Sequence, residues 1–312
     1  MITNKKILIT GGAGFIGSHL VEVLADNGNE VVVLDNLLRG NKIPSETFKK
    51  ITFLNEDVTN LDSVLNASVG CDMIFHFAAI LGVDIVADNP METMETEVVG
   101  TQNVVKAALQ HNVSKIIYAS TSGVYGHNAL EKSVTEEILV DPRTSYAMAK
   151  RYNEIYLASL HEEKGIDSIC LRFFNVYGPR QDNRMVVPRF FEQAQKDSDI
   201  TVYGTGEQTR DFTHINDTIK ATLLLAERIG GFEIFNIANE NELSIQELAE
   251  EIVILTKSKS NITLINAPSK RYDYEVGRRY GSSEKLFEYI NYKPETTIIA
   301  GLKNTLSSLN KA

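Results

Sequence analysis

The chain has 312 residues, of which 43% are hydrophobic and 23% are charged, and its formal net charge is −10. These proportions are typical of soluble globular proteins and exclude a disordered or fibrous chain, while the negative charge argues against nucleic-acid binding, which needs a basic surface. No stretch approaches the ~20 apolar residues that span a bilayer, and the first apolar run is too short for a signal peptide, so we expect a cytoplasmic protein with no membrane or nucleic-acid partner.

Short apolar runs alternate with longer helical patterns through the first two thirds of the chain. Six runs predict strands, at Ile7–Thr10, Glu30–Leu34, Ile51–Asn55, Met73–Phe77, Lys115–Ser120 and Ser168–Phe174. Four patterns between them predict helices, at Ile16–Asn27, Leu61–Val69, Met94–His111 and Thr144–Gly165. The strands are apolar without alternation, as expected for a parallel sheet that is covered on both faces. This order predicts an α/β fold with a doubly wound parallel sheet.

The pattern becomes less regular after Gly178-Pro179. Further elements are predicted as a strand at Ile200–Tyr203, a helix at His214–Ile229, a strand at Glu233–Ala238, and helices from the Ser244–Glu247 capping signal to about Thr256 and at Ser283–Ile290. No long linker rich in Gly, Ser or Pro separates this region from the first. We therefore expect a smaller second domain that is interleaved with the first.

A glycine-rich loop, Gly11-Gly12-Ala13-Gly14-Phe15-Ile16-Gly17, joins the first strand to the first helix. Glycines at 11, 14 and 17 allow a tight turn, close approach to a pyrophosphate, and close packing of helix against strand. The pyrophosphate would then meet free N–H groups at the positive end of the helix. Taken alone, such a loop also fits a flexible turn.

Acidic and small residues at the ends of the next strands support a dinucleotide site. Asp35 ends the second strand, at the spacing where a carboxylate meets the adenosine ribose, and it favours NAD over NADP because it repels a 2′-phosphate. Asp57 is either an adenine contact or a solvated turn residue. The predicted cofactor contacts are Gly11, Gly14, Phe15, Ile16, Gly17, Asp35, Asn36, Asp57, Val58, Phe77, Ala78, Ala79, Tyr146 and Lys150.

Tyr146 and Lys150 lie one turn apart on one face of a predicted helix. A free tyrosine has a pKa of ~10, but a nearby ammonium favours the phenolate, so such a tyrosine can act as a base near neutral pH. This spacing is common on amphipathic helices. The hydroxyls of Ser120-Thr121-Ser122, just after the fifth strand, strengthen the functional interpretation because they could reach the same substrate oxygen.

Together these motifs resemble the extended short-chain dehydrogenase/reductase family, in its nucleotide-sugar epimerase/dehydratase branch. The resemblance covers nearly the whole chain. Its motifs, in the family's order, are Gly11–Gly17, Asp35, Asp57, His76–Ala79, Ser120–Gly126, Tyr146 with Lys150, Arg172–Pro179 and Gly204–Phe212. The last two motifs are the most specific for sugar nucleotides.

The resemblance implies that the cofactor is NAD and that the substrate is a nucleotide sugar, with a UDP-sugar favoured. Tyr146 would remove the proton of the sugar 4-hydroxyl while the C4 hydride passes to NAD, Thr121 would share its hydrogen bond, and Lys150 would hold the nicotinamide ribose. The predicted substrate contacts are Thr121, Ser122, Tyr146, Asn175, Val187, Tyr203, Arg210 and Arg271. Asn175 and Arg210 resemble residues that hold the diphosphate, and no metal ligand is expected.

The resemblance also implies a Rossmann-type NAD-binding domain over residues 1–175, to which 212–238 return. A nucleotide-sugar-binding domain would comprise 176–211 and 239–312, so that the second domain is a smaller, interleaved C-terminal α/β unit. Relatives often form dimers, and we expect a homodimer through the helices predicted at Met94–His111 and Thr144–Gly165.

The two residues after Thr121 bear on the reaction. The family's 4,6-dehydratases carry Asp-Glu there and related decarboxylases keep a Glu at the second position, whereas this chain has Ser122-Gly123, which favours epimerisation at C4 of a UDP-hexose. A dehydratase or a UDP-glucuronate-type decarboxylase is the alternative, and Arg279 is a mild sign of a decarboxylase. Glu97 replaces an asparagine that is usual in epimerases, and it would raise the pKa of the tyrosine if both were charged.

Overall fold

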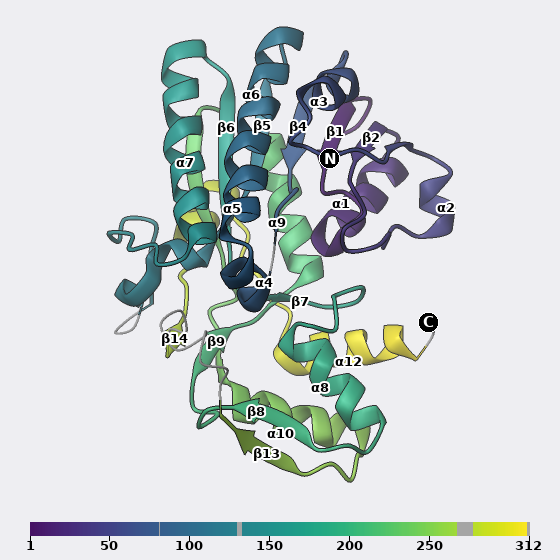
Figure 1. The fold of residues 1–312 in the computed structure, drawn as a ribbon, viewed down its shortest axis with the longest axis vertical. Coiled ribbons are helices and arrows are strands. Elements are labelled where there is room, and N and C mark those ends of the chain that lie inside the picture. The colour runs from purple at the N-terminus through teal and green to yellow at the C-terminus, as the bar shows by residue number, and fades with distance from the viewer. Residues whose placement is uncertain (81, 130–132, 267–276, 311–312) are drawn as a thin grey trace.

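A seven-stranded sheet, parallel throughout, forms the centre of the larger part of the molecule (Figure 1). Its strands, in sheet order, are β11 (Phe232–Ile237), β6 (Asp167–Phe173), β5 (Lys115–Thr121), β4 (Met73–His76), β1 (Lys6–Thr10), β2 (Glu30–Leu34) and β3 (Thr52–Leu54). The computed structural model describes residues 1–80, 82–129, 133–266 and 277–310. This sheet confirms the predicted doubly wound α/β fold.

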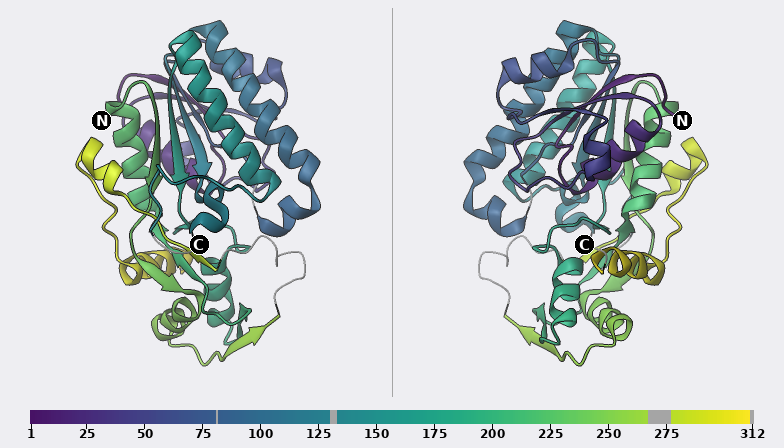
Figure 2. Two further views of the ribbon diagram at one scale, coloured as in Figure 1. Left: turned by 90° about the vertical axis from the view of Figure 1, so that its left-hand side faces the viewer. Right: turned by 90° about the vertical axis from the view of Figure 1, so that its right-hand side faces the viewer.

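Helices cover both faces of the sheet (Figure 2). One face carries α3 (Leu61–Ser68), α6 (Gly100–His111) and α7 (Ser145–Lys164). The other carries α1 (Phe15–Asp26), α9 (Ile215–Arg228) and α11 (Glu284–Ile290). The central strand shows why both faces need cover, because Ile7 and Ile9 of β1 pack into one core and Leu8 packs into the other.

The smaller part of the molecule has its own apolar core below the sheet in Figure 1. Its elements are α8 (Val186–Gln195), β8 (Ile200–Tyr203), α10 (Ile245–Thr256), β13 (Ile262–Ile265) and α12 (Ile298–Leu309). Strands β8 and β13 pair in parallel. Within the described ranges, no helix combines the length and the apolar character that crossing a membrane requires.

Short strands lie where the chain passes between the two parts. These are β7 (Val176–Tyr177), β9 (Thr209–Asp211), β10 (Thr213–His214), β12 (Glu242–Ser244) and β14 (Arg278–Arg279). β10 pairs with β7, and β9 lies between β12 and β14. We keep as a proposal the division into an NAD-binding domain of residues 1–175 and 212–238 and a substrate domain of the remainder.

The largest difference from the predicted elements concerns the helix expected at Met94–His111. The helical run begins at α5 (Pro90–Met94), continues as a π-helical turn, η1 (Glu95–Val99), and becomes α6. The short helices α2 (Ser45–Phe48) and α4 (Val83–Asp88), the 3₁₀ segment η2 (Ser122–Ala129), and α8 and α12 were not predicted. A π turn leaves no periodic signal in a single sequence because it needs only one extra residue in one turn.

The capping signal at the start of α10 forms the predicted capping box. The Ser244 hydroxyl accepts a hydrogen bond from the Glu247 N–H at 3.0 Å, and the Ser244 N–H donates to the Glu247 carboxylate at 2.8 Å. We expect Ser244→Ala to lower the free energy of unfolding by about 1 kcal/mol, measured by urea denaturation. Ser244→Thr keeps the acceptor and should stay close to wild type; equal losses in the two variants would contradict the role of the cap.

Candidate active site

The carboxyl ends of the parallel strands meet at one edge of the large sheet, and the predicted cofactor residues follow them. Gly11 follows β1, Asp35 follows β2, and Phe77 follows β4. Ligands of open α/β sheets bind along this edge, next to the point where the strand order reverses. In this sheet the reversal lies between β1 and β4.

The loop after β1 has no room for side chains at two of its glycines. Gly11 has a φ of +71°, and a Cβ atom there would lie 2.5 Å from the backbone nitrogen of Ala78. A Cβ atom at Gly17 would lie 2.2 Å from the carbonyl oxygen of Gly11. Helix α1 begins at Phe15, and Gly14 caps it without a side-chain hydrogen bond. This bare helix start, lined by glycine, fits a dinucleotide diphosphate.

Asp35 connects the glycine loop to the end of β2. Its Oδ2 accepts the Ala13 N–H at 2.9 Å, and its Oδ1 accepts the Leu37 N–H at 2.8 Å. Burial raises the pKa of Asp35, and these two hydrogen bonds oppose the rise. The carboxylate therefore faces the region where an adenosine ribose would lie if the diphosphate occupied the loop.

Asn36 and Asp57 lie together on the same side of the loop. The Asn36 amide donates to Asp57 Oδ2 at 2.8 Å, and the N–H and hydroxyl of Thr59 donate to Oδ1 at 2.8 and 2.7 Å. Burial alone would raise the pKa of Asp57, but the hydrogen bonds from Thr59 and Asn36 lower it overall. Val58 is buried against Gly100, where a Cβ atom would lie 2.8 Å from its Cγ1.

The segment after β4 lies beside the glycine loop. The Ala78 N–H donates to the Thr10 hydroxyl at 3.3 Å, and Phe77 and Ala79 are half-buried. His76 hydrogen-bonds to Thr10 at 2.7 Å and to the Thr101 hydroxyl at 3.0 Å. His76 is thus a satisfied core residue, and burial followed by the charge of the nearby lysine lowers its pKa to about 3.

The predicted catalytic threonine and tyrosine are brought together. Thr121 ends β5, and Tyr146 lies in the first turn of α7, where the Thr144 hydroxyl caps the helix by accepting the Ala147 N–H at 3.0 Å. The side chains of Thr121 and Tyr146 share a hydrogen bond. The Thr121 oxygen also accepts the N–H of Gly123 at 3.0 Å, and its own proton is directed at the Tyr146 oxygen, since this hydrogen bond lowers the pKa of the phenol.

Lys150 is buried beside Tyr146 and is paired with Glu97. Its Nζ lies 5.4 Å from the centre of the Tyr146 ring and 4.7 Å from that of Tyr118. The same atom lies 2.9 Å from Glu97 Oε2, and the two side chains are 1% and 0% exposed. Glu97, whose role the sequence left open, is therefore the ion-pair partner of Lys150, the predicted catalytic lysine.

This pairing changes the acid–base expectation for Tyr146. The sequence suggested that Lys150 would favour the phenolate, whereas burial and the negative charge of Glu97 raise the pKa of Tyr146, against a lowering by the Thr121 hydrogen bond. The reason is that the ammonium is paired with a carboxylate, so the tyrosine faces a pair with no net charge.

Asn153, which was not predicted as a site residue, contacts the backbone of Glu97 beside the ion pair of Glu97 and Lys150. Asn153 donates to the Glu97 carbonyl oxygen at 2.9 Å and to the Tyr118 hydroxyl at 2.8 Å. Tyr146, Lys150 and Asn153 are spaced at i, i+4 and i+7, which places them on one face of α7. The sequence signal for Asn153 was its position as a further polar residue on the helix face that carries Tyr146 and Lys150.

Arg172, from one of the recognised motifs, is part of a second buried network. Its guanidinium donates two hydrogen bonds of 2.8 Å to the Glu154 carboxylate and one of 2.9 Å to the Tyr125 hydroxyl. The Ser120 hydroxyl also donates to Glu154, at 2.6 Å. This network ties β5, β6, α7 and η2 together close to Thr121 and Tyr146 in the sequence.

The predicted substrate residues lie on different elements. Ser122 is buried at the start of η2, and Asn175 is half-buried between β6 and β7. Val187 is packed into the core of the smaller part. Their substrate contacts stay predictions.

Two further substrate residues lie at the ends of short strands. Tyr203 ends β8, where the Arg189 guanidinium lies 4.9 Å from its ring centre. Arg210 of β9 lies opposite Arg279 of β14, so two guanidinium-bearing positions are adjacent. Arg271 lies outside the described residues.

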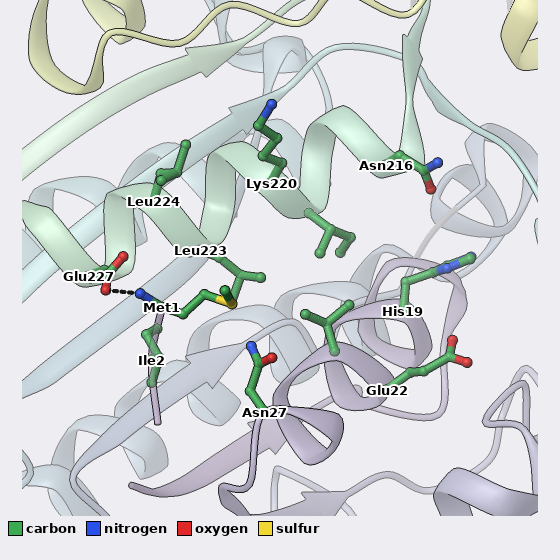
Figure 3. Close-up of a pocket in the computed structure, with 12 residues that line it drawn as sticks. Met1, Ile2, His19, Glu22, Asn27, Asn216, Lys220, Leu223, Leu224 and Glu227 are labelled. Atoms are coloured by element: carbon green, nitrogen blue, oxygen red, sulfur yellow. Dashed lines mark hydrogen bonds and ion pairs between the residues drawn. The ribbon is translucent and has the colours of Figure 1, made fainter. Parts of the chain in front are cut away.

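The pocket in Figure 3 lies away from this site, between α1 and α9. It has a volume of about 460 Å³ and is lined by residues such as His19, Lys220 and Leu223. None of the predicted site residues lines it.

A family model described as "NAD dependent epimerase/dehydratase family" matches residues 7–238. A UDP-N-acetyl-alpha-D-glucosaminuronate decarboxylase from Bacillus cytotoxicus is 38% identical, over 97% of this chain and 97% of its own length. The structure of a UDP-glucose 4-epimerase from Thermotoga maritima with UDP-glucose is 30% identical, covers 98% of this chain and 99% of its own, and has a TM-score of 0.92. A Thermus thermophilus UDP-glucose 4-epimerase in complex with NAD is 28% identical, covers 98% and 99% of the two chains, and has a TM-score of 0.89.

Proposed function

The chain belongs to the NAD dependent epimerase/dehydratase family, and from this premise we propose that it inverts C4 of a UDP-linked hexose. It is an enzyme of this family and its cofactor is NAD. The observation that carries the proposal is the Thr121–Tyr146 pair beside Lys150, followed by Ser122-Gly123 with no carboxylate. Withdrawal and return of a hydride at one carbon needs only one acid–base group.

In the proposed reaction Tyr146 removes the proton of the sugar 4-hydroxyl. Thr121 lies beside Tyr146 and would turn its single hydroxyl proton from the phenol to the same sugar oxygen, while its own oxygen still accepts from Gly123. Gly11, Gly17 and Asp35 would hold NAD, which when bound would supply the acceptor and donor of the C4 hydride. Tyr146 then returns its proton to the oxygen, after the keto sugar has presented its opposite face.

Position 123 supports epimerisation over dehydration. A Cβ atom at Gly123 would lie 3.2 Å from Thr121 Oγ1 and 3.8 Å from the Cβ of Ala147. A side chain there would therefore start in contact with the catalytic threonine, where a second acid or base would be useful. Glycine provides none, and an unactivated hydroxyl such as that of Ser122 is too weak an acid and base to take this role at neutral pH.

Decarboxylation is the second candidate because the Bacillus cytotoxicus relative, at 38% identity, is a decarboxylase of a uronic acid. Oxidation of a uronic acid at C4 places a ketone β to its C6 carboxylate, so the oxidised sugar is a β-keto acid. Such an acid loses CO₂ without a further base, so Gly123 does not oppose this reaction as strongly as dehydration. The substrate would then have to carry a carboxylate at C6.

NMR of the purified protein with four sugars separates the candidates. UDP-glucose, UDP-N-acetylglucosamine, UDP-glucuronate and UDP-N-acetylglucosaminuronate are each incubated in D₂O. We expect a 4-epimer without net formation of NADH and without deuterium at C5. Released CO₂ with deuterium at C5 would establish the decarboxylase instead, and no turnover of any of the four would contradict both.

We also propose that two copies dock through α6 and α7. On α7, Met148, Tyr152 and Ile155 are spaced at i, i+4 and i+7 and are 50%, 45% and 55% exposed. Leu109 of α6 is 40% exposed. This apolar face, on the helices expected at the interface, supports a second copy as its occupant. Light scattering should give twice the monomer mass, and Tyr152→Glu should reduce it; a monomeric wild type would overturn the proposal.

A further inference from the structure

Glu97 is held inside the protein by the π-helical turn η1. Single π turns inside α-helices often lie at functional sites. The Glu97 carbonyl oxygen accepts hydrogen bonds from the Asn153 amide at 2.9 Å and from the Thr101 hydroxyl at 2.6 Å. Its side chain is 0% exposed. Two helices therefore fix the backbone of this residue, and the carboxylate has little freedom to leave its position.

The carboxylate and the Lys150 ammonium form a buried pair. The pair is 2.9 Å apart, between an oxygen of Glu97 and Nζ of Lys150. Each charge alone would be costly to bury, so each stabilises the ionised form of the other. The ammonium also lies over the rings of Tyr118 and Tyr146. The carboxylate thus fixes both the place and the net charge of the group beside the proposed base.

Counting charges shows what the carboxylate does to Tyr146. With a neutral side chain at position 97, the ammonium would stand alone beside the phenol and would stabilise the phenolate. With Glu97, the same ammonium carries a counter-charge 2.9 Å away, so the pair has no net charge. Forming the phenolate then places an excess negative charge in a buried site, which is costly.

We propose that Glu97 is a positioning residue, which fixes the Lys150 ammonium and offsets its charge, so that proton removal by Tyr146 requires a more alkaline solution than it would with a neutral residue at position 97. The inference rests on the proposed function in that it takes Tyr146 as the base. It goes beyond that function because it assigns the pH range of the reaction to a residue that need not touch the sugar.

Other titratable groups around the pair do not change charge near neutral pH. His76 of β4 has a pKa lowered to about 3, chiefly by burial. Tyr118 of β5 and Cys170 of β6 have pKa values raised by burial, well above the usual ranges of a phenol and a thiol. Burial also raises the pKa of Glu97, and the Lys150 charge opposes that rise.

Three described carboxylates on the neighbouring elements are either solvated or paired elsewhere. Glu92 of α5 and Glu95 of η1 are exposed. Glu154, one turn after Lys150 on α7, is paired with Arg172. A shift in the pH dependence between pH 6 and 9 would therefore report on the tyrosine and the ion pair beside it.

Glu97→Gln tests the proposal because it keeps the shape of the side chain and removes its charge. We expect the midpoint of the alkaline rise of kcat/KM to move to lower pH by about one unit, as for removal of a like charge within several ångströms. Glu97→Asp keeps the charge and should return the midpoint to near the wild-type value. Where Glu97→Gln does not fold, Glu97→Asn takes its place.

Glu154→Gln is the matched control. Glu154 is a fully buried residue of α7, and its carboxylate lies 2.8 Å from the Arg172 guanidinium. Breaking this pair should lower the Tm about as much as Glu97→Gln does, without moving the midpoint of the pH dependence of kcat/KM. Equal midpoints in wild type and Glu97→Gln, or an equal shift in Glu154→Gln, would overturn the proposal.

A spectroscopic titration separates this proposal from the proposed function. In protein labelled with ¹³Cζ-tyrosine, the Tyr146 signal is assigned by its loss in Tyr146→Phe. We expect it to titrate at lower pH in Glu97→Gln than in wild type. This measurement needs no turnover, so absence of epimerase activity would overturn the proposed function, whereas an unchanged titration would overturn the role of Glu97.

Discussion

Tyr146→Phe should lower kcat by about two to four orders of magnitude, the range that general acid–base catalysis contributes. The variant keeps the ring that lies 5.4 Å from Lys150 Nζ and removes only the hydroxyl that bonds to Thr121. The rate is measured by NMR on whichever UDP-sugar the protein converts.

A tyrosine on another face of the same helix provides the control. Tyr152 is 45% exposed and stacks on Tyr156 with ring centres 6.1 Å apart. Tyr152→Phe should keep both kcat and Tm near wild type. Turnover of Tyr146→Phe within a factor of a few of wild type, with intact folding, would show that the phenol is not the base.

Gly17→Ala should both destabilise the protein and release its cofactor. The new Cβ atom would lie 2.2 Å from the Gly11 carbonyl oxygen and 2.8 Å from the Gly12 Cα, so the loop must move. Overpacking of this kind costs about 1–3 kcal/mol. The displaced loop is the one that fits the diphosphate, so we expect NAD affinity to fall at least tenfold, by about 1.4 kcal/mol or more. Urea denaturation and calorimetric titration with NAD measure the two effects.

Gly277→Ala is the matched substitution. Among the described residues, no atom lies within 4 Å of a Cβ atom placed at Gly277, so the variant should keep both stability and NAD affinity. A Gly17→Ala protein that binds NAD as wild type does would mean that the loop after β1 does not hold the diphosphate.

Local signals explain which elements the sequence predicted well. Helix α7 was expected over Thr144–Gly165 and spans Ser145–Lys164, because Thr144 caps its start and Gly165 ends it with a φ of +72°. Strand Ile200–Tyr203 was predicted correctly from its hydrophobic run, and the start of α10 from its capping residues. Hydrophobic runs and caps act over a few residues, so a single sequence contains them.

Long-range contacts explain what the sequence left open. Glu97 and Lys150 are far apart in the chain, and only the packing of η1 against α7 brings their charges within 2.9 Å. The pairing of Arg210 with Arg279 across two short strands likewise depends on the tertiary fold. Thr121 and Tyr146 could be proposed as catalytic because a family motif carries them, whereas their electrostatic surroundings could not be predicted.

The order in which the strands occur has a consequence for how the chain matures. β6 is complete at Phe173, but its outer neighbour β11 begins only at Phe232, after α8, β8 and α9 have been made. During synthesis, therefore, the edge of β6 stays open while a segment of another part of the molecule emerges. Open strand edges pair readily with other chains, and such distant pairing slows folding. Nascent chains that stop before Phe232 therefore leave the edge of β6 open to pairing with other chains.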